Sequence, residues 1–122
     1  MDDLHDIAIV GGGLVGSSLA IALDDCGFRV ALIEAAIPRV ADQPSYDERN
    51  LALARASINA LESLGVWAHV TSQPAAIERI HVSRRGEFGA VHLDAGKLGL
   101  PAFGAVLPAR ELGNALLLRL DA

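Results

Sequence analysis

The fold of this chain is decided by the stretch Asp6-Ile-Ala-Ile-Val-Gly-Gly-Gly-Leu-Val-Gly16, in which a short apolar strand runs directly into a glycine-rich turn. Residues 7–10 are rich in β-branched side chains, as in a buried parallel strand. Gly11, Gly13 and Gly16 then follow at the spacing G-x-G-x-x-G, and an apolar helix is expected from Leu14 to about Cys26. The pattern predicts a turn that binds the diphosphate group of a dinucleotide.

The three glycines have separate physical roles: a tight turn, room for the pyrophosphate beside the backbone, and close contact between helix and strand. The first turn of the helix offers free N–H groups and the positive end of the helix dipole to a phosphate. Ala20 and Leu23, four and seven residues after Gly16, share a face that is predicted to pack against the sheet. Gly27 is predicted to end the helix.

A second apolar strand is expected from Phe28 to Ile33, and it ends at Glu34. Glu34 lies 23 residues after Gly11, close to the spacing at which a carboxylate accepts hydrogen bonds from an adenosine ribose. A negative charge at this position disfavours a 2′-phosphate, which favours NAD or FAD over NADP. The alternative is a glycine-rich turn in another α/β protein, followed by an acidic residue by chance.

Beyond Glu34 the sequence predicts a covering loop, two helices and a β-hairpin. The expected elements are a loop at 35–48, a short strand or helix start at 51–54, a helix at 57–64 ended by Gly65, hairpin strands at 77–84 and 90–93, a short apolar segment at 105–107, and a last helix from about Ala109 with the apolar stripe Leu112, Leu116, Leu117 and Leu120.

Only two parallel strands can be identified, fewer than a doubly wound sheet needs. We therefore expect an α/β fold in which a Rossmann-like βαβ unit, suited to FAD or NAD, carries a β-hairpin excursion and is truncated before the rest of the parallel sheet. Residues 1–122 are accordingly expected to be the N-terminal, incomplete portion of an FAD/NAD(P)-binding domain.

Composition and charge exclude several classes of protein. The 122 residues are 52% hydrophobic, which excludes a disordered chain, yet no apolar run reaches the roughly 18 residues of a transmembrane helix. The net charge of −5 argues against a nucleic-acid partner. The acidic N-terminus lacks the basic start of a signal peptide. The single cysteine, Cys26, fits a reducing cytoplasm, and its thiol is expected to be buried.

Longer segments of the chain resemble a known family. Residues 6–34 resemble the extended dinucleotide fingerprint of flavoproteins. Further segments resemble the FAD-dependent aromatic hydroxylases of the p-hydroxybenzoate hydroxylase fold. They are Asp47-Glu-Arg49 with Leu51-Ala-Leu53, and then Leu61-Glu-Ser-Leu-Gly-Val-Trp67. The segments 80–89 and 109–116 resemble the ubiquinone-biosynthesis branch of that family. The resemblance covers nearly the whole chain but only about the first third of a full-length member, and the family's second flavin motif is absent.

This resemblance implies FAD as the cofactor, NAD(P)H as the reductant, O₂ as the oxidant and a prenylated phenol as the substrate. It places residues Gly11, Gly12, Gly13, Leu14, Val15 and Gly16 around the FAD diphosphate, Glu34 at the adenosine ribose, and Arg49 and Arg110 where they reach the cofactor. Alternatively, Arg49 is a solvated charge beside Asp47 and Glu48, and Arg110 is a solvated residue of a first helical turn. No catalytic residue and no metal ligand is assigned, and His81 and His92 are interpreted as a structural pair across the hairpin rather than a metal site.

Two other functions stay open from the sequence. One is an NAD-dependent dehydrogenase or a reductase of another flavin family, and the other is a non-catalytic dinucleotide-binding module. A chain of this extent is expected to self-associate, because its sheet has an open edge, and to be inactive alone. The substrate is expected to contact regions downstream of this chain, and the protein is expected in the cytoplasm, with peripheral association at the inner membrane as a further expectation for the full-length form.

Overall fold

The glycine-rich stretch forms the predicted βαβ unit in the computed structural model, which describes residues 4–36 and 49–122. Strand β1 (Ile7–Val10) pairs in parallel with β2 (Val30–Ile33), with Ile7 opposite Val30. Between them lie α1 (Leu14–Leu23) and the short 3₁₀-helix η1 (Asp24–Cys26), which ends at Gly27 with φ of +79°. Helix and second strand are both shorter than predicted, but the order and the parallel pairing are as expected.

A second, three-stranded sheet joins segments that are distant in the sequence. Strand β7 (Gly104–Pro108) lies between β3 (Asn50–Ala54) and β4 (Ala75–Ala76) and is antiparallel to both. Segment 51–54, which the sequence left open between strand and helix, is therefore a strand, and α2 (Arg55–Ser63) follows it at once. Leu51 lies opposite Leu107, so the two apolar segments lie side by side in the same sheet.

The hydrophobic core lies between the three helices and β7. Helix α3 (Ala109–Leu120) packs against α1 and against the 3₁₀-helix η2 (Trp67–His69), and the predicted stripe of leucines is buried up to Leu117, while Leu120 reaches the surface. The buried core cluster comprises Ile21, Leu61, Val66, Leu107, Leu112, Ala115 and Leu116.

One expectation about α1 needs correction, and its packing is more extensive than expected. The buried residues of α1 are Ser17 and Ile21, Ala20 and Leu23 are partly buried, and the helix packs against α3 as well as against β1 and β2. Cys26 is exposed rather than buried, with its Sγ 3.5 Å from the carbonyl oxygen of Ala22. The α-helix ends at Leu23, and the thiol lies in the surface 3₁₀ turn that follows.

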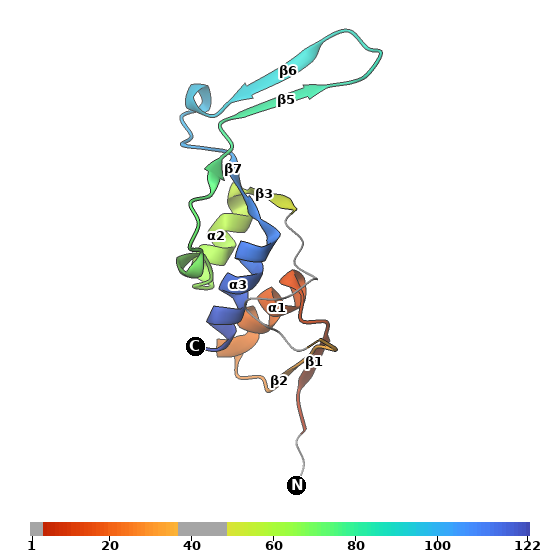
Figure 1. Ribbon diagram of the computed structural model, residues 1–122, viewed down its shortest axis with the longest axis vertical. Helices are drawn as coiled ribbons and strands as arrows, with labels where there is room; N and C mark the ends of the chain where they lie inside the picture. The colour runs from red at the N-terminus through yellow and green to blue at the C-terminus, as the bar shows by residue number, and fades with distance from the viewer. Residues whose placement is uncertain (1–3, 37–48) are drawn as a thin grey trace.

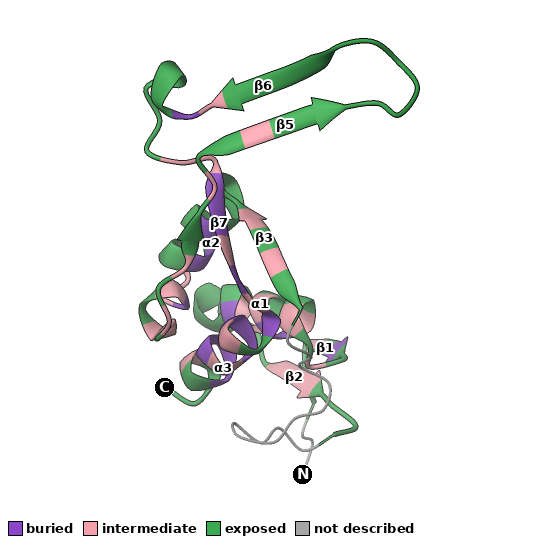
Figure 2. Cartoon of the chain, turned by 45° about the horizontal axis from the view of Figure 1, so that its top comes forward, coloured by how far each residue is buried: buried purple, intermediate pink, exposed green. Residues whose placement is uncertain are grey.

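The β-hairpin extends from one end of the molecule, and β1 and β2 lie at the other end (Figure 1). Strand β5 (Arg79–Ser83) pairs with β6 (Ala90–Asp94), and the 3₁₀-helix η3 (Gly96–Leu98) follows. Strand alternation gives the hairpin one apolar face, and nearly all of the hairpin is exposed (Figure 2). That face carries Ile80, Val82, Val91 and Leu93.

Among residues 4–36 and 49–122, no helix has the length and apolar character needed to cross a membrane.

We predict that Leu116→Ala lowers the free energy of unfolding by about 2–5 kcal/mol, because the deleted atoms leave a cavity in the core. Leu116 is 1% exposed, whereas Leu118 on the same helix is 42% exposed. Leu118→Ala is therefore the matched control and should change the free energy by about 0.5 kcal/mol or less. Urea denaturation measures both, and equal losses in the two variants would contradict the placement of the core.

Candidate functional site

The turn between β1 and α1 is shaped by its first glycine. Gly11 has φ of +103°, a conformation that residues with a Cβ rarely adopt, and its N–H donates to the carbonyl oxygen of Ile33 at 2.8 Å. The turn is thereby joined to the end of β2. Gly11 makes the tight reversal that the sequence pattern assigns to it.

The other two glycines of the motif, Gly13 and Gly16, differ in how much space surrounds them. A Cβ on Gly16 would overlap the carbonyl oxygen of Gly11, so α1 can lie this close to the turn only with glycine there. A Cβ on Gly13 would meet no atom within 4 Å, so the space over this residue is open. Gly13 is also the N-cap of α1, where no side chain caps the helix and no acidic residue occupies the first turn. Open space beside uncapped N–H groups fits a diphosphate.

Ser17 lies in α1 and contacts the glycine turn, a role that the sequence pattern did not predict. It is 2% exposed, its hydroxyl donates to the carbonyl oxygen of Gly12 at 3.0 Å, and its N–H donates to the carbonyl oxygen of Gly13 at 3.0 Å. The available signal was a hydroxyl residue in the first turn of an otherwise apolar helix. Ser17 fixes the orientation of the Gly12 peptide from inside the fold.

Glu34 follows β2 and reaches back to the same turn. Its Oε2 accepts the N–H of Gly12 at 2.7 Å, and its Oε1 accepts the N–H of Ala36 at 3.0 Å. These N–H groups, that of Ala36 first, lower the pKa of the exposed Glu34 carboxyl because they stabilise its charged form. Glu34 therefore presents an ionised, solvent-exposed carboxylate next to the turn, as required of an acceptor for ribose hydroxyls.

The two arginines singled out from the sequence come together at one end of the β3–β7 pair. The carbonyl oxygen of Arg49 accepts the N–H of Ala109 at 2.9 Å, and Arg110 is the next residue, in the first turn of α3. Both are exposed. Asp47 and Glu48, the neighbours in the alternative interpretation of Arg49, lie outside the described residues. Contact of either arginine with a cofactor stays a prediction.

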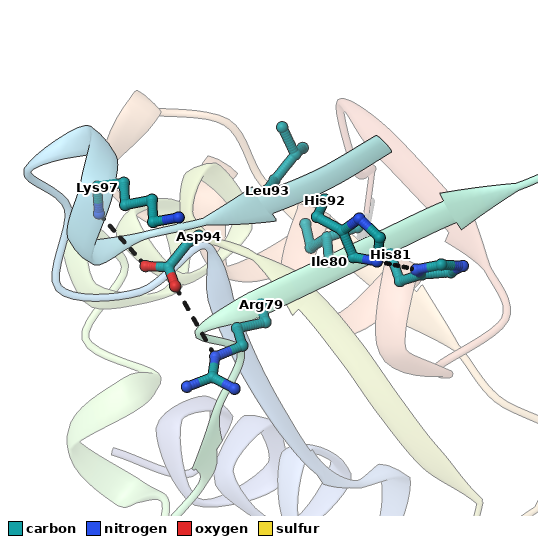
Figure 3. A pocket seen from close by; sticks show the side chains of 7 residues that line it. All are labelled: Arg79, Ile80, His81, His92, Leu93, Asp94 and Lys97. Carbon is teal, nitrogen blue, oxygen red and sulfur yellow. Dashed lines mark hydrogen bonds and ion pairs between the residues drawn. The ribbon is translucent and has the colours of Figure 1, made fainter. Parts of the chain in front are cut away.

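A second concave region lies on the hairpin, separate from the glycine turn. It is an open pocket of about 380 Å³ (Figure 3). His81 of β5 lies opposite His92 of β6, as predicted, and His81 Nδ1 is 2.6 Å from His92 Nε2. On the same two strands, Arg79 Nε forms an ion pair with Asp94 Oδ2 at 3.8 Å. Within the described part of the chain, no group of three or more metal-ligating side chains occurs. The pocket thus presents polar pairs that hold the two strands together.

Comparison with known sequences gives a family match over most of the chain. The model of a family described as FAD binding domain matches residues 5–120. The 3-demethoxyubiquinol 3-hydroxylase of Escherichia coli is 42% identical over 125 aligned residues, which cover 96% of this chain and 30% of that protein. The ubiquinone hydroxylase UbiL of Rhodospirillum rubrum is 34% identical over 119 residues, with 98% and 28% covered. The chain spans about 30% of the length of these relatives.

Solved structures give the same fold at lower identity. The p-nitrophenol 4-monooxygenase of Pseudomonas putida superposes with a TM-score of 0.72 at 21% identity, over 99% of this chain and 30% of that one. A probable FAD-dependent monooxygenase of Pseudomonas aeruginosa gives 0.69 at 23% identity, over 97% and 30%. These matches confirm the predicted α/β fold class.

We predict that Glu34→Gln is less stable than the parent chain near pH 7 and that the difference disappears on acidification. A carboxyl whose pKa is lowered by folding stabilises the fold above its unfolded pKa, and this contribution is lost as the pH falls through the folded pKa. Urea denaturation across that range measures it, with Glu78→Gln as a control for the loss of one charge. A constant difference at all pH values would contradict the assignment.

Proposed function

Because this chain belongs to the FAD-binding domain family, we propose that it is the N-terminal FAD-binding portion of a flavin monooxygenase that hydroxylates a prenylated phenol in ubiquinone biosynthesis. The observation that carries the proposal is the glycine turn with open space over Gly13 and the Glu34 carboxylate 2.7 Å from the Gly12 N–H. A family match to FAD-binding domains favours FAD over the NAD-dependent alternative.

The residues of the turn and of the two strand ends would hold the cofactor. Residues 11–16 surround the diphosphate with backbone N–H groups, and Glu34 accepts the ribose hydroxyls. Arg49 and Arg110 supply positive charge from the end of the β3–β7 pair, which offsets the two negative charges of the diphosphate. When bound, FAD supplies the redox chemistry by which NAD(P)H and O₂ hydroxylate an aromatic ring. No side chain of this chain is assigned as an acid, base or nucleophile.

The names of two relatives support the substrate class. They are a 3-demethoxyubiquinol 3-hydroxylase and a ubiquinone hydroxylase, and both names describe hydroxylation in the ubiquinone series. Segments 80–89 and 109–116 most closely resemble a hydroxylase of 2-octaprenyl-6-methoxyphenol, a phenol of the same series, and this resemblance favours that substrate. Both are phenols with a long apolar tail, so we place the full-length protein in the cytoplasm, peripherally at the inner membrane. The substrate itself contacts regions downstream of this chain.

Nucleotide binding by the chain tests the site directly. Gly13→Val should abolish binding of ADP, because a branched side chain fills the open space over residue 13. Glu34→Ala should weaken ADP binding, because the ribose hydroxyls lose a charged hydrogen-bond acceptor. Isothermal titration calorimetry with ADP measures both. Parent-like affinity in Gly13→Val would refute the site.

The assembly and activity of the 122-residue chain form a separate prediction. Within the described residues β1 and β2 form a sheet of two strands only, and the apolar hairpin face is exposed, with Val82 at 55% and Val91 at 57%. Sedimentation should therefore show dimers or larger species. Phenol-stimulated oxidation of NAD(P)H with added FAD should not exceed that of free flavin. A monomer that hydroxylates a phenol would contradict both expectations.

A further inference from the structure

Gly12 lies between the first two fingerprint glycines and is not required to be glycine by the G-x-G-x-x-G pattern. Its φ is not in the left-handed region, so its backbone could carry a side chain. A Cβ built on Gly12 would, however, lie 3.1 Å from both the Cβ and the Oε2 of Glu34. The atoms that crowd this position therefore belong to the Glu34 side chain.

The peptide groups of Gly12 are fixed by side chains on both sides. Its N–H donates to Glu34 Oε2 at 2.7 Å, and its carbonyl oxygen accepts the hydroxyl of the buried Ser17 at 3.0 Å. The second oxygen of Glu34 is anchored by the N–H of Ala36 at 3.0 Å. The carboxylate thus connects the end of β2 to the middle of the glycine turn.

We infer that Glu34 is a positioning residue for the diphosphate-binding turn, acting through the N–H of Gly12 and independently of any contact with a ribose. Gly12 complements that role, because a Cβ at this position would crowd the Glu34 side chain at 3.1 Å and push the carboxylate away from the N–H. The inference rests on the proposed function, since it assumes that the turn binds a diphosphate. A carboxylate oxygen has more than one acceptor site, so Glu34 can hold the turn and still accept a ribose hydroxyl.

The first experiment removes the ribose hydroxyls from the ligand. ADP and 2′,3′-dideoxyadenosine diphosphate are titrated into the parent chain, Glu34→Ala and the control Glu78→Ala. A positioning role predicts that Glu34→Ala weakens binding of the dideoxy ligand by roughly three- to tenfold, the range expected for the loss of about one hydrogen bond. Weakened binding of ADP alone, with the dideoxy ligand unaffected, would overturn the inference and leave the proposed function standing.

The second experiment needs no ligand and reports on the Glu34 carboxylate through the N–H resonance of Ala36. Gly12→Ala should shift this resonance, because the added methyl group displaces the carboxylate, and should have no such effect in the Glu34→Ala background. Gly13→Ala is the matched control, since its Cβ meets nothing within 4 Å. Equal shifts in both backgrounds would overturn the inference. A parent chain that binds no ADP would refute the proposed function, and this resonance would still decide the role of Glu34.

Discussion

The structure depends on one close approach, that of Gly16 to the carbonyl oxygen of Gly11. Because no Cβ intervenes, α1 begins immediately beside the end of β1, and its axis is set by the strand. Ile21, further along α1, is thereby brought into the core with Leu112 and Leu116 of α3. The packing of the helical layer is thus determined at the same residues that shape the candidate site.

A second close approach of the same kind organises the other end of the core. A Cβ on Gly104 would overlap the carbonyl oxygen of Leu53, so β7 can pair with β3 only with glycine at its first position. The pairing carries α3 into the core and sets Arg110 beside Arg49. Two glycine contacts therefore fix the helices and bring the separated parts of the candidate site into one fold.

Local patterns predicted the parts of this fold that are formed by neighbouring residues. The βαβ unit, the Gly27 helix end, the hairpin with His81 opposite His92, and the last helix all follow from short-range spacing. The pairing of β3 with β7 could not be predicted, because nothing local specifies which distant apolar segment a strand selects. The exposure of Cys26 and the burial of Ser17 likewise depend on where the helix ends and what packs on it. For the candidate site, spacing predicted the glycines and Glu34, but not that the carboxylate contacts the turn itself.

The hairpin also bears on how the chain reaches this fold. Strands β3 and β7 are separated in the sequence by α2, β4 and the whole of β5 and β6, so their pairing closes the longest loop within the second sheet. Closing a long flexible loop costs chain entropy and slows folding. In the described part of the chain the main contacts of the hairpin strands are with each other, and a hairpin forms in roughly 1–10 μs, before such a closure. Once formed, the hairpin brings Arg79 beside Asp94 and so shortens the effective length of the loop between β3 and β7. The hairpin thereby lowers the entropic cost of assembling the core from which it projects.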